Sequence, residues 1–187
     1  MTISDPVEMN KFVSLLRGIN VSGQKIIKMD DLRTLFESLG FKNVITYIQS
    51  GNVIFESSLQ SKREIKEKTE NGIEDRYGFH VHTEIRTEKE LEDILINKPF
   101  DHMDREENGT KFSVSFLSSA PLKSKVSKIQ KYVSAPEKIF INGREAYFHC
   151  PNGFGRSKLT TAFLEKKLDV KATARNWKTV NRLFELM

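Results

Sequence analysis

The apolar and polar positions of residues 11–86 alternate between strand and helix periods. An apolar run predicts a central strand at 11–18, and apolar residues at helical spacing predict a helix at 30–39. Asp30 or Asp31 can cap the start of that helix, and Gly40 fits its end. The pattern then predicts strands at 43–48 and 52–56, a helix at 59–77 and a strand at 79–86. This β-α-β-β-α-β order is the ferredoxin-like order, in which helices cover one face of an antiparallel sheet.

The rest of the chain repeats much of this element order. An acidic helix at 88–96 and an irregular connector at 98–109 lead to a strand at 111–117 and a helix at 121–133. A hairpin follows, with strands at 137–141 and 144–150 around an Asn142-Gly143 turn, and then a helix at 156–168, a short extended piece and a final helix at 176–186. We therefore predict an α+β chain with a ferredoxin-like unit at 1–86, an acidic helix and connector at 87–109, and a related βαββα unit with a C-terminal helix at 110–187.

The charge is unevenly distributed along the 187 residues. Residues 1–86 balance 12 Lys/Arg against 12 Asp/Glu, residues 87–109 carry 3 against 8, and residues 110–187 carry 15 against 5. A basic segment attracts phosphate-bearing partners by its electrostatic field. Lysines spread over helix faces also keep a surface soluble, and the sequence leaves both interpretations open.

Several classes of protein are disfavoured by what the chain lacks. No run of about 18 apolar residues predicts a membrane helix, and the polar, acidic start does not resemble a signal peptide. Cys150 is the single cysteine, so no internal disulfide can form. We therefore expect a cytoplasmic protein without a membrane partner.

No catalytic or metal-binding pattern stands out. His80 and His82 fall on one face of a predicted strand, but no third ligand accompanies them, so we expect a solvated face and no metal. His149 and Cys150 are neighbours on a strand and point to opposite faces. The sequence leaves enzymatic activity open and predicts no catalytic residue and no cofactor.

Four polar segments could hold an anion. Each combines amide or hydroxyl groups with a cation or with glycine-bearing backbone, which suits a phosphate or a carboxylate. The candidate ligand-binding residues are Arg17, Gly18 and Asn20 after the first strand, Gln49, Ser50 and Asn52 at a hairpin tip, Arg156, Ser157 and Lys158 at a predicted helix start, and Arg175, Asn176 and Trp177. Ordinary turn chemistry is the commoner explanation for the first two segments.

The third segment is notable for its two cations and the fourth for its tryptophan. Cations at a helix start are unfavourable for the helix dipole, so Arg156 and Lys158 invite an external anion. Trp177, the single tryptophan, either stacks on a base or anchors a core, and the core is the commoner role.

These segments together resemble an uncharacterised bacterial family known only as a domain of unknown function. The matching stretches are 16–23 with 28–32, 46–53, 155–159 and 172–180, and the resemblance runs from about residue 11 to 185. Ser22 stands where members of the family usually have glycine. The resemblance implies a two-part α+β fold and favours one site shared by these loops, and it implies no activity or cofactor.

Three functional hypotheses follow. The first is a protein that binds an anionic ligand (a nucleotide, a phosphorylated metabolite or nucleic acid) in a cleft between the two units. The second is an enzyme that acts on an anionic substrate by electrostatic stabilisation. The third is a structural module in which Arg17 and its companions brace the packing of one unit on the other. The oligomeric state is left open.

Overall fold

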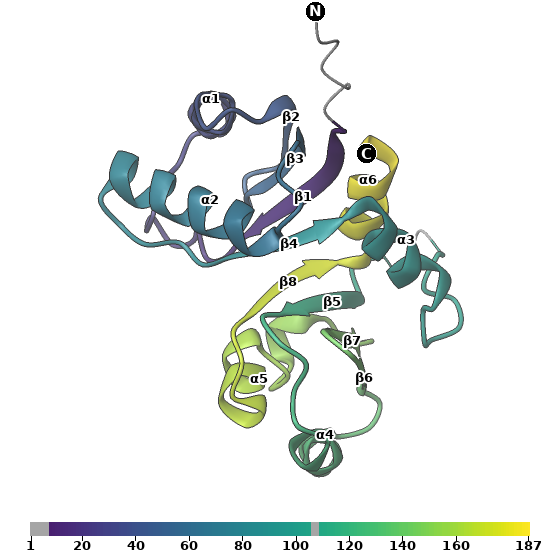
Figure 1. Ribbon diagram of the computed structural model, residues 1–187. Helices are drawn as coiled ribbons and strands as arrows, with labels where there is room; N and C mark the ends of the chain where they lie inside the picture. Colours follow the sequence, from purple (N-terminus) through teal and green to yellow (C-terminus); the bar gives the residue numbers. More distant parts are fainter. Residues whose placement is uncertain (1–7, 106–108) are drawn as a thin grey trace, which may run out of the picture. The chain divides into compact units, whose positions relative to one another are not determined.

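The computed structural model describes residues 8–105 and 109–187 (Figure 1). The polar start of the chain, residues 1–7, and residues 106–108 of the predicted connector lie outside the described residues. Internal contacts divide the chain into two units. The first runs to Glu88 and includes Leu186–Met187, and the second comprises Lys89–Glu185.

The first unit has the predicted β-α-β-β-α-β order. Its elements are β1 (Asn10–Leu16), α1 (Met29–Ser38), β2 (Lys42–Tyr47), β3 (Asn52–Ser57), α2 (Lys62–Tyr77) and β4 (Thr83–Thr87). The four strands form an antiparallel sheet in the order β2-β3-β1-β4. The last strand begins later than the predicted 79–86, at Thr83, which pairs with Leu16 at the end of β1.

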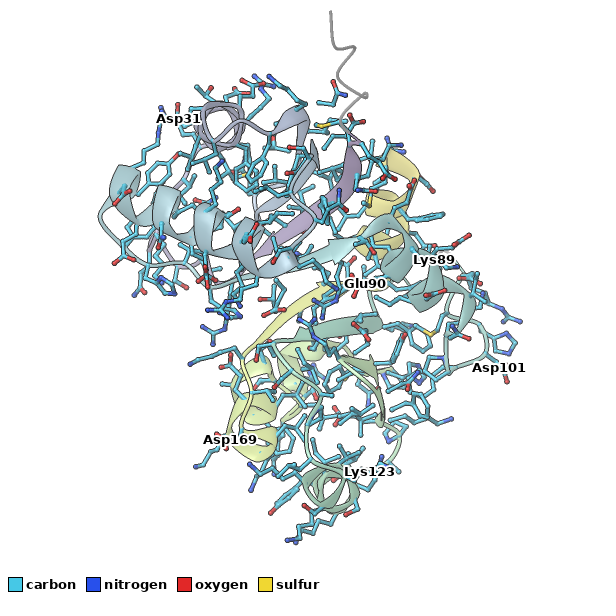
Figure 2. The ribbon with its side chains drawn as sticks, viewed as in Figure 1. Asp31, Lys89, Glu90, Asp101, Lys123 and Asp169 are labelled. Carbon is cyan, nitrogen blue, oxygen red and sulfur yellow. The ribbon has the colours of Figure 1, made fainter. Side chains whose placement is uncertain are left out.

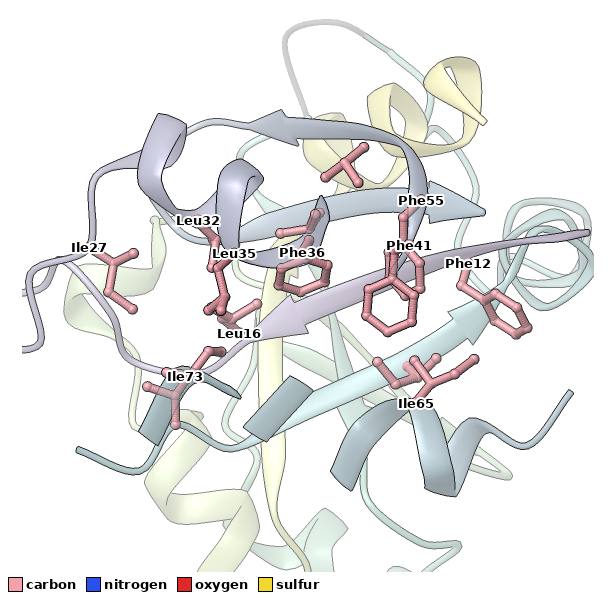
Figure 3. Packing of buried hydrophobic residues seen from close by; sticks show 14 of the residues in the cluster. Phe12, Leu16, Ile27, Leu32, Leu35, Phe36, Phe41, Phe55, Ile65 and Ile73 are labelled. Carbon is pink, nitrogen blue, oxygen red and sulfur yellow. The ribbon is translucent and has the colours of Figure 1, made fainter. Parts of the chain in front are cut away.

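A cluster of phenylalanine rings holds the helices of the first unit on one face of the sheet. Phe55 lies on β3 with its ring centroid 4.4 Å from that of Phe41 and 5.4 Å from that of Phe36 on α1. Figure 3 shows these rings together with Phe12 and with Ile65 of α2. Because α1 and α2 both contribute to this cluster, burial of the rings fixes the helical layer on the sheet.

The second unit repeats the strand order of the first. Its elements are α3 (Glu88–Ile96), β5 (Phe112–Leu117), α4 (Lys123–Ile129), β6 (Lys138–Asn142), β7 (Glu145–His149), α5 (Thr161–Leu168), β8 (Ala172–Asn176) and α6 (Trp177–Leu186), with 3-10 turns at Gln130–Tyr132 and Phe154–Arg156. The sheet order β6-β7-β5-β8 corresponds strand for strand to that of the first unit. The predicted α+β class and the repeated element order are confirmed.

One helix start was predicted wrongly, and the error affects the candidate site. Helix α5 begins at Thr161 and not near Arg156. Thr160 is the cap, because its hydroxyl accepts a hydrogen bond from the backbone N–H of Phe163. Ser157 has extended backbone and accepts from the N–H of Leu159, which keeps this segment out of the helix.

None of the helices in residues 8–105 and 109–187 has the length and apolar character that crossing a membrane requires.

The phenylalanine cluster gives the first testable prediction. We expect Phe55→Ala to lower the free energy of unfolding by about 3–5 kcal/mol, because it removes a fully buried ring and leaves a cavity. The measurement is urea unfolding followed by circular dichroism. The control is Phe140→Ala, whose ring is 44% exposed on β6 and which we expect to cost less than about 1 kcal/mol. Equal losses in the two variants would contradict this account of the core.

Candidate ligand-binding site

The four candidate segments form two pairs, one within each unit. In the first unit, the loop after β1 lies against the tip of the β2–β3 hairpin. The side-chain amide of Asn20 donates to the carbonyls of Gln49 and Ile27, each at 2.9 Å, and its oxygen accepts from the N–H of Ile27 at 2.8 Å. Asn20 therefore ties the loop to the hairpin tip through backbone groups.

The hairpin tip itself is closely packed. Gly51 has a φ of 78°, and a Cβ there would lie 2.6 Å from Cδ1 of Ile19 and 2.8 Å from Cβ of Leu16. Asn52 is fully buried, and its amide donates to the carbonyl of Tyr47 and to the Ser50 hydroxyl. Gly51 is explained by its positive φ and close packing, and Asn52 by its hydrogen bonds within the hairpin. Neither explanation involves a ligand.

The other candidates in this pair lie near the same loop. Arg17 is half-buried, and its backbone N–H donates to the carbonyl of His82 at 2.9 Å. Gly18 is exposed with a φ of 67°, and Gln49 is exposed at the hairpin tip. Within the first unit, Asn20 joins the loop to the hairpin, and Asn52 makes its bonds within the hairpin.

In the second unit, the remaining two segments adjoin a pocket of about 320 Å³, here called the α5 pocket, whose wall includes the candidates Arg175 and Asn176 but not Arg156, Ser157, Lys158 or Trp177. Its wall is formed by Ser113 and Ser115 of β5, Phe148 of β7, Phe154, Leu159, Thr160 and Thr161 around the start of α5, and Ala174, Arg175 and Asn176 of β8. Segment 155–159 and strand β8 were both singled out by the sequence, and they meet here.

Two hydroxyl groups open into this pocket. Ser113 and Ser115 pair with Asn176 and Ala174 in the sheet, so all four side chains lie on one face. The serines are only 7% and 2% exposed. In the described ranges, neither hydroxyl has a hydrogen-bond partner. Neither hydroxyl is among the fully buried, unpartnered side-chain atoms of the described residues, so both are open to the pocket, where each can donate a hydrogen bond to a ligand.

Arg175 and Asn176 are neighbours on β8 but serve different faces of the sheet. Arg175 pairs with Val114, so its side chain points away from the face that carries Ser113 and Ser115, and it contributes only backbone to the pocket wall. Its guanidinium donates to the carbonyl of Ala174 at 2.8 Å. Burial lowers the pKa of Arg175 to about 10, so it keeps its charge at neutral pH.

Asn176 and Trp177 begin helix α6. The side-chain oxygen of Asn176 accepts from the N–H of Thr179 at 2.8 Å, which is an N-terminal cap. Asn176 is also part of the pocket wall. Trp177 is 1% exposed, and its indole N–H donates to the carboxylate of Asp104 at 3.0 Å. The tryptophan is a core anchor and is not placed to stack on a ligand.

Cationic side chains stand beside the α5 pocket. Arg156 and Lys158 are exposed and lie in the sequence between Phe154 and Leu159, which line the pocket, although neither cation is part of the pocket wall. Ser157 between them is half-buried and supports the turn through its bond to the N–H of Leu159.

A group of lysines lies around Tyr132, which is not part of the pocket wall. The ammonium of Lys167 is 3.9 Å from the ring centroid of Tyr132, and that of Lys131 is 5.5 Å away. Hydrogen bonding and charge from Lys167, with charge from Lys131 and Lys128, lower the pKa of Tyr132. Figure 2 marks this region with Lys123 at the start of α4 and Asp169 after the end of α5. The excess of Lys and Arg in residues 110–187 is therefore not, by itself, evidence that an anion binds in the α5 pocket.

Sequence reasoning missed Ser113, Ser115, Thr160 and Thr161. The signal was present in β5, where serines alternate with Phe112, Val114 and Phe116 in a strand whose every residue is buried. Two hydroxyl groups on one face of such a strand indicate either an internal partner or a cavity.

The sequence also missed a buried ionic network in the first unit. Glu84 is 1% exposed and lies 2.7 Å from Nε2 of His82, 3.2 Å from Arg86 and 3.4 Å from Lys66. Burial alone would raise the pKa of Glu84, but the hydrogen bond from His82 and the charges of Lys66 and Arg86 outweigh it and lower the pKa to about 2. The predicted solvated face of this strand was therefore wrong beyond His80.

The described residues, 8–105 and 109–187, contain no group of three or more His, Cys, Asp or Glu side chains that could hold a metal ion.

Comparisons with known proteins address the fold and the family. The family described as "Protein of unknown function (DUF1697)" matches residues 9–147. No curated protein shows significant similarity. Among solved structures, the conserved bacterial protein SP0830 from Streptococcus pneumoniae is similar with a TM-score of 0.76 and 22% sequence identity, over 96% of this chain and 99% of that chain. At this identity the likeness shows the fold alone.

The Asn20 brace gives a second prediction. We expect Asn20→Ala to lower the free energy of unfolding by about 2–3 kcal/mol, because three hydrogen bonds are lost and alanine disfavours the φ of 55°. Asn20→Asp keeps the acceptor and should cost less. The measurement is chemical denaturation, with the exposed turn variant Asn152→Ala as control. An Asn20→Ala protein as stable as the control would rule out the bracing role.

Glu84 gives a third prediction, which concerns pH. Its folded pKa of about 2 lies below the unfolded value of about 4.3, so its stabilisation is present above that unfolded value and is lost as pH falls toward 2. We expect Glu84→Gln to reduce the free energy of unfolding by about 3 kcal/mol at pH 7 and by much less near pH 2. Urea unfolding at pH 7, 4 and 2.5 measures this. Glu37→Gln, an exposed change on α1, should be neutral throughout. A gap from wild type that does not change with pH would refute the assignment.

Proposed function

The chain belongs to the DUF1697 family of proteins of unknown function, and from the geometry of its second unit we propose that it binds a small anionic ligand in the α5 pocket. The observation that supports the proposal is the pair of serines on β5, Ser113 and Ser115, which are buried residues and line the pocket next to the start of a helix. Each hydroxyl can donate to a phosphate or carboxylate oxygen.

The start of α5 adds a positive electrostatic contribution. Thr160 and Thr161 both line the pocket, and α5 begins at Thr161. The first N–H groups of a helix point out of its N-terminus, and with the helix dipole they favour an anion there. The amide nitrogen of Asn176 offers a further donor from β8.

The size and remaining walls of the pocket define the class of ligand. A volume of about 320 Å³ is at the lower end for small-molecule sites. Phe148, Phe154 and Leu159 provide apolar contact, and Arg156 and Lys158 lie on the exposed side of the same segment. These features suit one phosphorylated or carboxylated metabolite, with the anionic group toward the serines and the organic part against the phenylalanines.

Thermal-shift and calorimetric titration with matched probes test the proposal. The charged probes are ribose 5-phosphate and adenosine monophosphate, and ribose and adenosine are their uncharged counterparts. We expect at least one charged probe to raise Tm at millimolar concentration, since a bound ligand stabilises the folded chain. Its uncharged counterpart should have no effect.

Variants localise the binding. Ser113→Ala with Ser115→Ala should weaken binding of the charged probe by about tenfold or more, the usual loss for hydrogen bonds to a charged group. The matched control is Ser14→Ala, which removes a buried, unpartnered hydroxyl from the corresponding strand β1 of the first unit. The proposal fails if neither charged probe binds at 10 mM, or if the serine variant and the control bind alike.

A further inference from the structure

We propose that the surface around Tyr132 binds single-stranded nucleic acid, with lysines on the phosphates and the tyrosine ring against a base. Tyr132 ends the 3-10 turn that follows α4, and its ring meets that of Phe163 on α5 edge-on, with the ring centroids 5.7 Å apart. This contact anchors the ring, while the residue stays 41% exposed. Tyr132 is not part of the α5 pocket wall, so this surface is distinct from the site proposed above.

Three ammonium groups gather around this ring. Those of Lys167 and Lys131 lie 3.9 Å and 5.5 Å from its centroid, and the charge of Lys128 also acts on the phenol. In residues 8–105 and 109–187, none of the three lysines forms an ion pair with a carboxylate. One ammonium is enough for a cation–π contact with the ring, so that contact does not account for the other two. Like charges without a counter-ion repel one another, and a bound polyanion relieves this repulsion.

The basic character of this surface is not a requirement of the fold. Helix α4 has three lysines and no acidic residue, a net charge of +3. Helix α1, which takes the same place after the first strand of its own sheet, has three acidic residues and one arginine, a net charge of −2. Among the lysines of α4, only Lys125 has a carboxylate partner in the described ranges, Asp169 at 3.0 Å. Since the same strand order accepts either sign of charge here, the lysines indicate a partner.

The exposed ring favours a single strand over a duplex or an acidic peptide. The bases of a duplex are stacked on one another, whereas a base of a single strand can leave the stack and lie on an aromatic ring. An acidic peptide would use the lysines and leave the ring without a role. The ammonium of Lys167 now lies over the ring, and its flexible stem lets it move to a phosphate when a base takes that place.

The number of lysines predicts how the affinity depends on salt. Each phosphate neutralised on a single strand contributes about −0.7 to the slope of log K against log salt concentration, so three lysines give a slope of about −2. A base stacked on a ring releases no counterion, so the ring adds affinity without changing the slope. The roles of the charges and of the ring can therefore be measured separately in one series of titrations.

The experiment follows the fluorescence anisotropy of a labelled oligothymidylate of about 15 nucleotides as the full chain is added, at several sodium chloride concentrations. We expect saturable binding at about 50 mM salt, with the slope given above. Lys131→Gln with Lys167→Gln should weaken binding about tenfold or more and reduce the slope to about −0.7. The control is Lys42→Gln with Lys68→Gln, which removes two exposed lysines of the first unit, one of them 5.7 Å over the ring of Phe41, and should change neither quantity.

Two changes at Tyr132 test the ring. Tyr132→Leu keeps apolar contact with Phe163 and removes the aromatic face, so we expect it to weaken binding about fivefold or more and to leave the salt slope unchanged. Tyr132→Phe keeps the ring and should bind as the wild type does. Because the two variants lose the same hydroxyl, a difference between them reports the ring itself.

Three results would overturn the proposal. The first is the absence of saturable binding at low salt. The second is equal binding by the double lysine variant and its control, or by Tyr132→Leu and the wild type. The third is competition by polyglutamate as strong as by unlabelled oligothymidylate, which would indicate an acidic protein partner. The outcome is independent of the α5 pocket, because none of the varied residues lines that pocket.

Discussion

Both faces of strand β5 are buried over its whole length, and this constraint decides what its polar side chains can do. A hydroxyl on such a strand must bond inside the protein, stay unsatisfied at a cost, or face a cavity. Ser14 on the corresponding strand β1 is an example of the second case, since its hydroxyl is buried without a partner in the described part of the chain. Ser113 and Ser115 are examples of the third, and the α5 pocket follows from them.

The two units differ most in the helix that covers the sheet. They share a strand order, but α2 has 16 residues and α5 only 8. At about 1.5 Å per residue, α5 is about 12 Å shorter than α2. The chain before α5 forms a short 3-10 turn and an extended segment, and the space between that segment and the sheet is the α5 pocket. A common strand order thus supports a long covering helix in the first unit, and a short helix with a pocket at its start in the second.

Periodicity in the sequence predicted the order of elements, because buried strands and amphipathic helices have distinct spacings. The start of α5 was harder to predict, since Ser157 and Thr160 are both plausible caps and only the backbone path selects Thr160. Asn20, Asn52, Asn176 and Trp177 were predicted as ligand-binding residues, and the hydrogen bonds that their side chains make in the structure are with the protein itself. The buried serines were overlooked because a strand pattern does not reveal which side chains lack a partner.

Trp177 has one practical consequence for how this protein can be studied. It is the single tryptophan of the chain, it is buried, and it lies in the second unit. Its fluorescence reports the environment of that unit alone, whereas far-ultraviolet dichroism averages over both. Denaturation curves recorded by the two methods on the same sample will therefore coincide when the units melt as one and separate when they melt in turn.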